Sequence, residues 1–144
     1  MHIALTADQN MVPGLHVTLY SLLMSTEVEP HIHLVHEGLT VEQVELLRET
    51  ISLGGDVKSF QAIPFRSLAV SSGEATFHGS LLTFSLIALP QYLNDVGRFI
   101  WLDSDLIVTC SLEALWKREF DGAIAAVSHL KTKHALPKWR EMLN

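Results

Sequence analysis

Cysteine is almost absent from this chain of 144 residues, and long apolar runs are absent too. Cys110 stands alone, which excludes a disulfide within the chain and fits a reducing compartment. No apolar run reaches the roughly 20 residues that a membrane-spanning helix requires. Residues 1–5 lead directly into polar residues 6–10 and do not resemble a signal peptide. We therefore expect a cytoplasmic protein without a transmembrane segment.

Basic residues are scarce, since 10 Lys and Arg oppose 16 Asp and Glu, for a formal charge of −6. This balance argues against a nucleic-acid-binding surface. Gly54-Gly55 and Gly73 lack the spacing of a phosphate-binding loop, so an anionic nucleotide would need a metal ion to supply positive charge. Apolar residues are by contrast abundant, at 48%, with a mean hydropathy of +0.25. Such a composition predicts apolar surface that further chain or a second copy covers.

Short apolar segments of strand character alternate with segments of helical periodicity. Strands are expected at 2–7, 31–36 and 57–63, in the apolar stretch that ends at Asp103 and Asp105, and at 107–109 and 122–128. Helices are expected at 13–25, at 41–53 after a capping box formed by Thr40 and Gln43, at 80–92, and at 112–116 after Ser111 as N-cap. This order predicts one α/β domain over 1–144, with a mostly parallel sheet flanked by helices.

The most informative motif is Asp103-Ser104-Asp105, which interrupts the apolar, β-prone stretch 98–108. Two anions in such a strand are costly unless a cation lies at its end. Carboxylate oxygens suit Mg²⁺ or Mn²⁺, and either ion can also carry a phosphate ligand. The pattern favours a metal site. The alternative is a polar turn between strands, with both aspartates solvated or capping a helix.

Asp8 and Asn10 follow the first strand, at the edge of a parallel sheet where ligands bind. We expect them to face the same crevice as the acidic motif. His78 immediately precedes a helix near this crevice and is a binding candidate.

Three other histidines lie on one strand, where His31 and His33 share a face and His36 points the other way. For these we favour a hydrogen-bonded or solvent-facing strand edge over a metal site. Trp101 and Trp116 are predicted to be core residues rather than platforms for a sugar ring.

Two segments carry a specific resemblance. Residues 2–10 match an opening strand followed by an Ala-Asp-Asp-Asn nucleotide loop, and residues 99–116 match a segment of the form YLDSDVIV…SLxELW. Residues 31–40 follow the corresponding second strand and its turn into a helix. Together they resemble glycosyltransferase family 8, the retaining sugar transferases of the GT-A fold. The similarity extends to about His129, which corresponds to the N-terminal part of a typical family member.

The resemblance implies metal-dependent transfer of a hexose, from UDP-glucose or UDP-galactose, to a glycan or lipopolysaccharide-type acceptor. The metal, Mn²⁺ or Mg²⁺, would assist the departure of UDP. No catalytic residue is assigned. The residues that match the family's binding positions are Thr6, Ala7, Asp8 and Asn10 for the nucleotide, Ser104 for the ribose, His78 for the sugar, and Asp103 and Asp105 for the metal.

The chain also departs from the family pattern. Phe84-Ser85-Leu86 stands where the family usually has Tyr-x-Arg, Gln9 replaces the second loop aspartate, and His129 replaces an aspartate. The chain ends before the family's Asn-Ala-Gly segment and the late histidine of its metal shell. An alternative hypothesis is therefore a non-catalytic, UDP-binding fragment or subunit. A phosphatase-type aspartyl nucleophile is disfavoured, because that motif lies near the start of its own fold.

Overall fold

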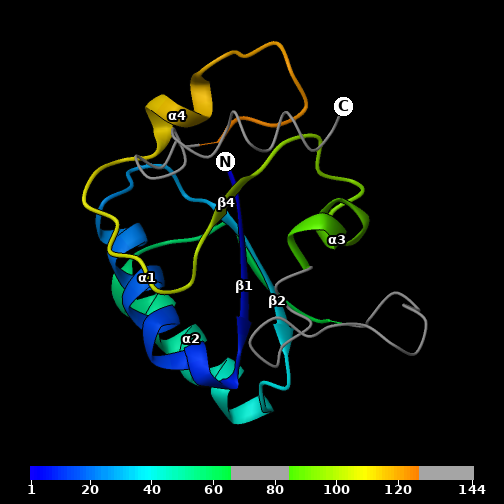
Figure 1. Cartoon of the computed structure of the whole chain (residues 1–144). Helices are drawn as coiled ribbons and strands as arrows, with labels where there is room; N and C mark the ends of the chain where they lie inside the picture. The colour runs from blue at the N-terminus through cyan, green and yellow to red at the C-terminus, as the bar shows by residue number, and fades with distance from the viewer. Residues whose placement is uncertain (66–84, 127–144) are drawn as a thin grey trace, which may run out of the picture.

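The computed structural model describes residues 1–65 and 85–126, in which strands and helices alternate (Figure 1). The expected strands at 2–7, 31–36 and 57–63 are all present, each with ends within two residues of the prediction. The elements are β1 (His2–Asp8), the 3-10 helix η1 (Gln9–Met11), α1 (Val12–Met24), β2 (His31–Glu37), α2 (Val41–Gly54), β3 (Ser59–Pro64), α3 (Ser85–Tyr92), β4 (Ile100–Leu102) and α4 (Glu113–Lys117).

The strands form one parallel sheet in the order β3-β2-β1-β4. Leu5 at the centre of β1 lies opposite Leu34 of β2 and Leu102 of β4. Helices α1 and α2 lie on one side of the sheet and α3 lies on the other (Figure 1). The predicted α/β class, with a parallel sheet flanked by helices, is confirmed.

The larger part of the core lies between the sheet and the α1–α2 pair. Leu15, Leu19 and Leu22 of α1 are fully buried, as their helical spacing predicts, and they pack with the apolar side of β1 and β2. Helix α2 begins with the predicted capping box, in which Thr40 and Gln43 exchange side chain-to-backbone hydrogen bonds. Val41 has the helical spacing of the inward-facing residues of α2 but lies in its first turn and is 74% exposed.

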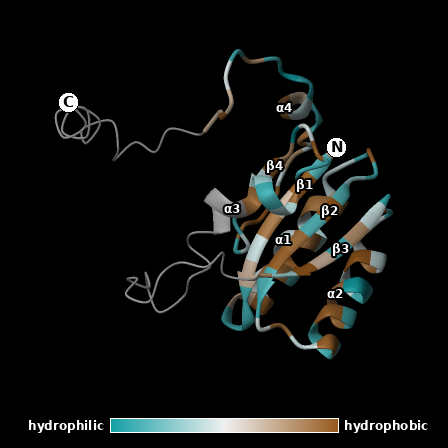
Figure 2. Ribbon diagram, turned by 90° about the vertical axis from the view of Figure 1, so that its right-hand side faces the viewer, coloured by the Kyte–Doolittle hydropathy of each residue, from teal (hydrophilic) through white to brown (hydrophobic). Residues whose placement is uncertain are grey.

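A smaller core covers the opposite side of the sheet. Leu89 and Leu93, from α3 and the turn after it, are buried against Ala4 and Val35 of the central strands. Trp101 of β4 packs against this cluster, in agreement with its prediction as a core residue. In Figure 2 the strands combine brown, hydrophobic positions with teal, hydrophilic ones. Their apolar residues Ile3, Leu5, Ile32 and Leu34 are fully buried.

The C-terminal third of the described chain differs from the sequence-based expectation. Residues 122–126 are exposed and form no strand, and 127 and 128 lie outside the described residues. Residues 107–109 pair with no strand of the described sheet. Helix α4 begins at Glu113, whose N–H donates to Ser111 Oγ at 3.2 Å, although the N-cap position itself is Leu112. No helix among the described residues is long and apolar enough to cross a lipid bilayer.

Arg98 fixes α4 against the rest of the structure. Its guanidinium donates to the carbonyl oxygens of Leu115, Trp116 and Arg118 and lies 5.0 Å from the Trp116 ring centroid. The Trp116 ring in turn lies 6.2 Å from the ring of His2. Trp116 is therefore only partly buried, at the end of the sheet and in neither core cluster, so its prediction as a core residue is wrong.

Candidate functional site

The candidate site lies at the edge of the sheet where the carboxyl ends of β1 and β4 meet. Because Leu5 and Leu102 are register partners, Asp103 leaves the sheet beside Thr6, and β1 continues to Asp8. The parallel sheet thus brings the two sequence-predicted segments, residues 6–10 and 103–105, to one edge. This is the edge at which open α/β sheets bind ligands.

The loop after β1 is built around the Asp8 carboxylate. Asp8 Oδ1 accepts hydrogen bonds from the backbone N–H groups of Asn10, at 2.8 Å, and Met11, at 3.2 Å. It thereby caps η1 and orients the chain that enters α1. Gln9 Nε2 donates to the carbonyl oxygen of Gly38, which ties this loop to the turn after β2. Gln9, which replaces the second aspartate of the family's nucleotide loop, therefore connects the loop after β1 to the turn after β2.

The acidic motif presents its two carboxylates outward. Asp103 and Asp105 are exposed, whereas Ser104 between them is only 2% exposed. The burial of Ser104 anchors the backbone of the turn and leaves both aspartates accessible to a ligand. Within the described residues there is no group of three or more His, Cys, Asp or Glu side chains that could hold a metal ion by itself.

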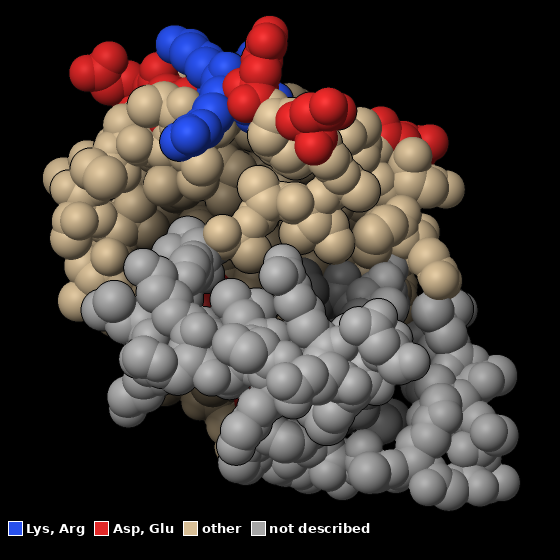
Figure 3. Space-filling model, turned by 45° about the horizontal axis from the view of Figure 1, so that its top comes forward, with Lys and Arg blue, Asp and Glu red and all other residues tan. Residues whose placement is uncertain are grey.

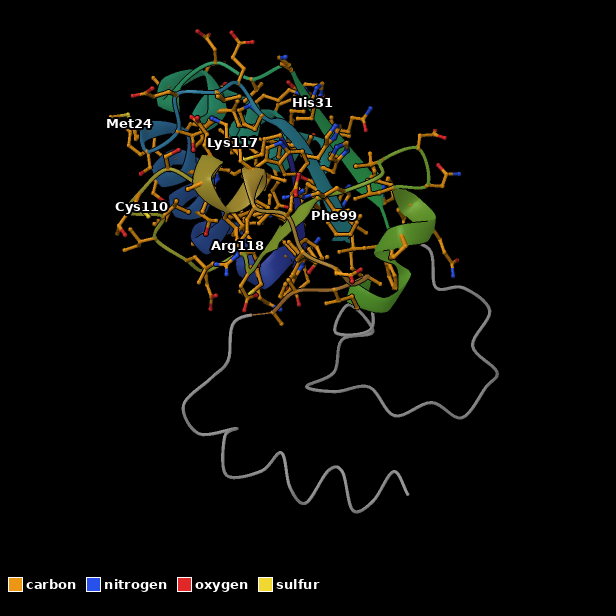
Figure 4. The ribbon with its side chains drawn as sticks, turned by 90° about the horizontal axis from the view of Figure 1, so that it is seen from above. Met24, His31, Phe99, Cys110, Lys117 and Arg118 are labelled. Atoms are coloured by element: carbon orange, nitrogen blue, oxygen red, sulfur yellow. The ribbon has the colours of Figure 1, made fainter. Side chains whose placement is uncertain are left out.

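The chain that follows the motif is held by α1 rather than by a strand. Thr18 Oγ1 donates to the carbonyl oxygen of Leu106 and accepts from its N–H, both at 2.9 Å. Val108 donates its N–H to Ser21 Oγ at 3.0 Å and accepts from Ser25 Oγ at 2.9 Å. Figure 4 shows this part of the chain running from β4 past α1 toward Cys110. We expected 107–109 to form a strand, whose backbone groups would bond to a neighbouring strand. Side-chain hydroxyls of α1 bond to the backbone here instead.

Gly14 lies one turn before Thr18 on the same helix and approaches the motif most closely. A Cβ atom at position 14 would lie 2.8 Å from the carbonyl oxygen of Ser104 and 3.2 Å from Asp105 Cα. Both neighbours are backbone atoms, so only glycine allows this approach. We did not predict Gly14, Thr18, Ser21 and Ser25, although their spacing of four, three and four residues marks one face of the helix.

The histidines gather at the opposite, amino-terminal end of the strands. His2 Nδ1 lies 3.0 Å from His33 Nε2, and His33 Nδ1 lies 3.2 Å from Gln61 Oε1. Burial lowers the pKa of His2 and of His33, and positively charged neighbours lower that of His2 further. His36 points to the other side of the sheet, where burial lowers its pKa. The predicted hydrogen bonding is confirmed for His31 and His33, but the predicted strand edge is wrong, because β2 lies between β3 and β1 in the sheet. Their neighbour His2 was not predicted.

Three positions named in the sequence analysis cannot be placed at the site. His78 lies outside the described residues, as do the side chain of Leu86 and residue His129. Among the described residues visible in Figure 3, acidic and basic side chains lie together along one edge of the molecule.

The comparison with known families decides the identity. Residues 2–141 match the family model described as glycosyl transferase family 8. The chain belongs to this family.

Among curated family relatives, the chain is 28% identical over 128 residues to a protein of Arabidopsis thaliana named probable galacturonosyltransferase-like 10. It is also 28% identical over 139 residues to probable galacturonosyltransferase-like 4 of the same plant. These alignments cover 85% and 88% of this chain but 35% and 37% of the relatives. The chain therefore spans little more than a third of the length of these relatives.

Solved glycosyltransferase structures share the fold. An active-site mutant of LgtC superposes with a TM-score of 0.71 at 23% identity, over 83% of this chain and 42% of that one. The galactosyltransferase LgtC with donor and acceptor sugar analogues gives 0.67 at 23% identity, over 83% and 43% of the two chains. Mouse xyloside xylosyltransferase 1 gives 0.56 at 18% identity, over 81% and 46%. The expected GT-A-like architecture and family membership are thus confirmed.

Proposed function

We propose that this chain is the nucleotide-sugar-binding part of a retaining, metal-dependent hexosyltransferase that takes a UDP-sugar as donor. The observation that carries the proposal is the exposure of Asp103 and Asp105 at the same sheet edge as residues 6–10. Family membership supports glycosyl transfer as the reaction. A glycan or lipopolysaccharide-type acceptor is part of the same proposal.

The carboxylates of Asp103 and Asp105 are suited to a metal ion that the substrate helps to bind. Two carboxylates offer hard oxygen ligands of the kind that Mg²⁺ and Mn²⁺ prefer. Two are too few for a protein-only cage, in agreement with the lack of a larger ligand group among the described residues. Magnesium-type sites are commonly completed by the phosphates of the substrate and by water. We propose that Asp103 and Asp105 would hold Mn²⁺ or Mg²⁺, which would supply the positive charge that the diphosphate of UDP needs at this acidic edge.

Within this proposal, each residue of the edge has a physical task. Asp8 holds the loop so that Asn10 lies at the sheet edge, where Thr6 would contact the uracil or ribose. Ala7 is fully buried in the core, so only its backbone could contribute to this site. Ser104 would lie beside the ribose, and His78 would contact the sugar. A bound divalent ion would stabilise the negative charge that develops on the departing diphosphate.

A second candidate function is nucleotide-sugar binding without turnover. The observation that favours it is coverage, since the chain spans 35% of one curated relative and 37% of another. Incubation with Mn²⁺ and UDP-glucose or UDP-galactose separates the two. Release of UDP, with or without an added glycan, indicates an enzyme, whereas binding without release indicates the binding fragment.

The proposal is tested by thermal unfolding of the whole chain with UDP, in Mn²⁺ or in EDTA. A ligand at about 100 times its Kd stabilises a protein by about 2.7 kcal/mol, which raises the Tm of a chain of this size by about 5–10 °C. We expect this shift only with Mn²⁺, and we expect Asp105→Asn to abolish it. Without ligand, Asp105→Asn should be at least as stable as the wild type, because a repulsion between neighbouring carboxylates is removed.

Asp56→Asn is the matched control. Asp56 is also exposed, but it precedes β3 and so lies toward the amino-terminal edge of the sheet. This variant should respond to Mn²⁺ and UDP as the wild type does. An equal shift in EDTA, or a normal response from Asp105→Asn, would contradict the proposed metal site.

A further inference from the structure

One face of α1 contacts the whole stretch of chain that contains and follows the acidic motif. We name this the α1 contact face, formed by Gly14, Thr18, Ser21 and Ser25. Gly14 meets the backbone of Ser104 and Asp105, and the three hydroxyls bond to Leu106 and Val108. Contact is therefore continuous from the motif to Val108.

The hydroxyls satisfy both polar backbone groups of Leu106 and of Val108. Elsewhere in this sheet such groups bond to a neighbouring strand, whose backbone offers partners whatever its side chains are. Here the partners are side chains, so the position of the stretch depends on which residues α1 carries. Removal of the Thr18 hydroxyl leaves both the N–H and the carbonyl oxygen of Leu106 without this partner, whereas removal of the Ser21 or Ser25 hydroxyl affects one backbone group of Val108.

Gly14 sets how near the motif comes to the helix. The 2.8 Å that would separate a Cβ from Ser104 O is shorter than any ordinary contact. Because the nearest atoms belong to backbone, any side chain at position 14 must displace the peptide between Ser104 and Asp105. That peptide carries the Asp105 side chain, so the displacement is passed to its carboxylate.

The same helix also begins at the nucleotide loop. Asp8 caps η1, which runs directly into α1, so Asn10 lies four residues before Gly14. Helix α1 is thus the common support of residues 8–10 and of the acidic motif. Its packing against α2 and the sheet, with Leu15, Leu19 and Leu22 fully buried, makes that support rigid.

We propose that Gly14 and Thr18 are positioning residues, which hold Asp105 at the location and orientation that metal–UDP binding requires. The inference rests on the proposed function, because it assigns a role relative to that ligand. Groups that orient metal-binding carboxylates typically change metal affinity about 10- to 100-fold when they are mutated. We expect effects of this size from the α1 contact face.

The first test compares Gly14→Ala with Gly97→Ala in the full chain. A Cβ at position 97 would meet no atom within 4 Å, so this variant controls for the loss of a glycine. The Kd for UDP is measured by calorimetry at one fixed, subsaturating Mn²⁺ concentration, where weaker metal binding also weakens UDP binding, and well below the Tm, so that all the protein is folded. We expect Gly14→Ala to bind about 10- to 100-fold more weakly and Gly97→Ala to bind as the wild type does.

The second test uses the Thr18 hydroxyl. Thr18→Val keeps the shape but removes the hydroxyl, whereas Thr18→Ser keeps the hydroxyl. We expect Thr18→Val to weaken UDP binding and Thr18→Ser to restore most of it. Amide hydrogen exchange adds a readout without ligand: the Leu106 N–H should exchange faster in Thr18→Val only, while that of Leu5 in β1 is unchanged.

The outcomes separate this inference from the proposed function. If Asp105→Asn loses UDP binding while Gly14→Ala and Thr18→Val bind normally, the positioning role is wrong and the metal site stands. If the wild type binds no UDP with any divalent ion, the proposed function and the positioning role both fail. Exchange at Leu106 then decides the remaining claim, that Thr18 holds this stretch of chain. Equal rates in Thr18→Val and Thr18→Ser would overturn that claim too.

Discussion

Helices α1 and α2 pack so closely that the addition of one methyl group at their contact should change the stability of the protein. Gly54 is the last residue of α2 and is buried against α1. A Cβ at this position would lie 3.2 Å from Leu23 Cβ, 3.4 Å from Leu23 Cδ1 and 3.4 Å from Tyr20 Cα. These distances require neighbouring atoms to move by a few tenths of an ångström. Gly54→Ala therefore sets a gain in helix propensity against the cost of overpacking.

The two effects differ in size. Replacing glycine by alanine in a helix interior gains about 1 kcal/mol, and the gain is smaller at a terminal residue. Extra methyl groups in a well-packed core cost about 1–3 kcal/mol. Leu23 is itself buried, and the Tyr20 contact is with backbone, so neither neighbour can yield freely. We expect Gly54→Ala to lower the free energy of unfolding by about 1–2 kcal/mol.

Urea unfolding at 25 °C measures this change, with Ser52→Ala on the exposed side of the same helix as control. Ser52 bonds only to the carbonyl oxygen of Arg48 one turn back, so its replacement should be neutral or stabilising by up to about 0.5 kcal/mol. In a Leu23→Ala background, the Cδ1 contact is gone and the penalty of Gly54→Ala should shrink. A Gly54→Ala protein as stable as the wild type would refute the tight crossing, and with it the rigidity that we ascribe to α1.

Two further predictions concern pH and association. Burial lowers the pKa of His2, His33 and His36, so the unfolded chain takes up protons at a higher pH than the folded chain does. The free energy of unfolding should therefore be highest above about pH 6.5 and should fall as the pH drops below this value. Urea unfolding at pH 7.5 and 5.5 checks this, and equal or greater stability at pH 5.5 would contradict it. Apolar side chains such as Ile107, at 71% exposed, and Ile124, at 86%, predict self-association at tens of micromolar. A single monomer boundary in sedimentation velocity, with no binding of a hydrophobic dye, would argue against it.

Much of the fold could be predicted because its signals are local. The period of Leu15, Leu19 and Leu22 marks the buried side of α1, and Thr40 with Gln43 marks the start of α2. The alternation of strands and helices is enough to predict a parallel sheet, and a parallel sheet brings Asp8 and Asp103 to one edge. The motif after β4 also carried the family resemblance that the comparison confirmed.

The expectations that failed concern segments whose partners are distant in the sequence. Residues 107–109 have the composition of a strand, but composition cannot show whether a free sheet edge is within reach. The stretch 122–126, Gly-Ala-Ile-Ala-Ala, is apolar, yet it is exposed and pairs with no strand of the described sheet. Val41 matches the helical period and is nevertheless exposed in the first turn of α2.

The amino-acid sequence by itself determined the order of strands and helices, their caps and the placement of two carboxylates after a strand, since each depends on neighbouring residues. The tertiary structure alone decided that hydroxyls of α1 hold the chain after the motif, through bonds between residues 83 to 88 positions apart. It also decided that His2 and His33 share a hydrogen bond across two strands. A periodic pattern shows which side of a helix is buried. What lies against that side is set by the packing of the whole chain.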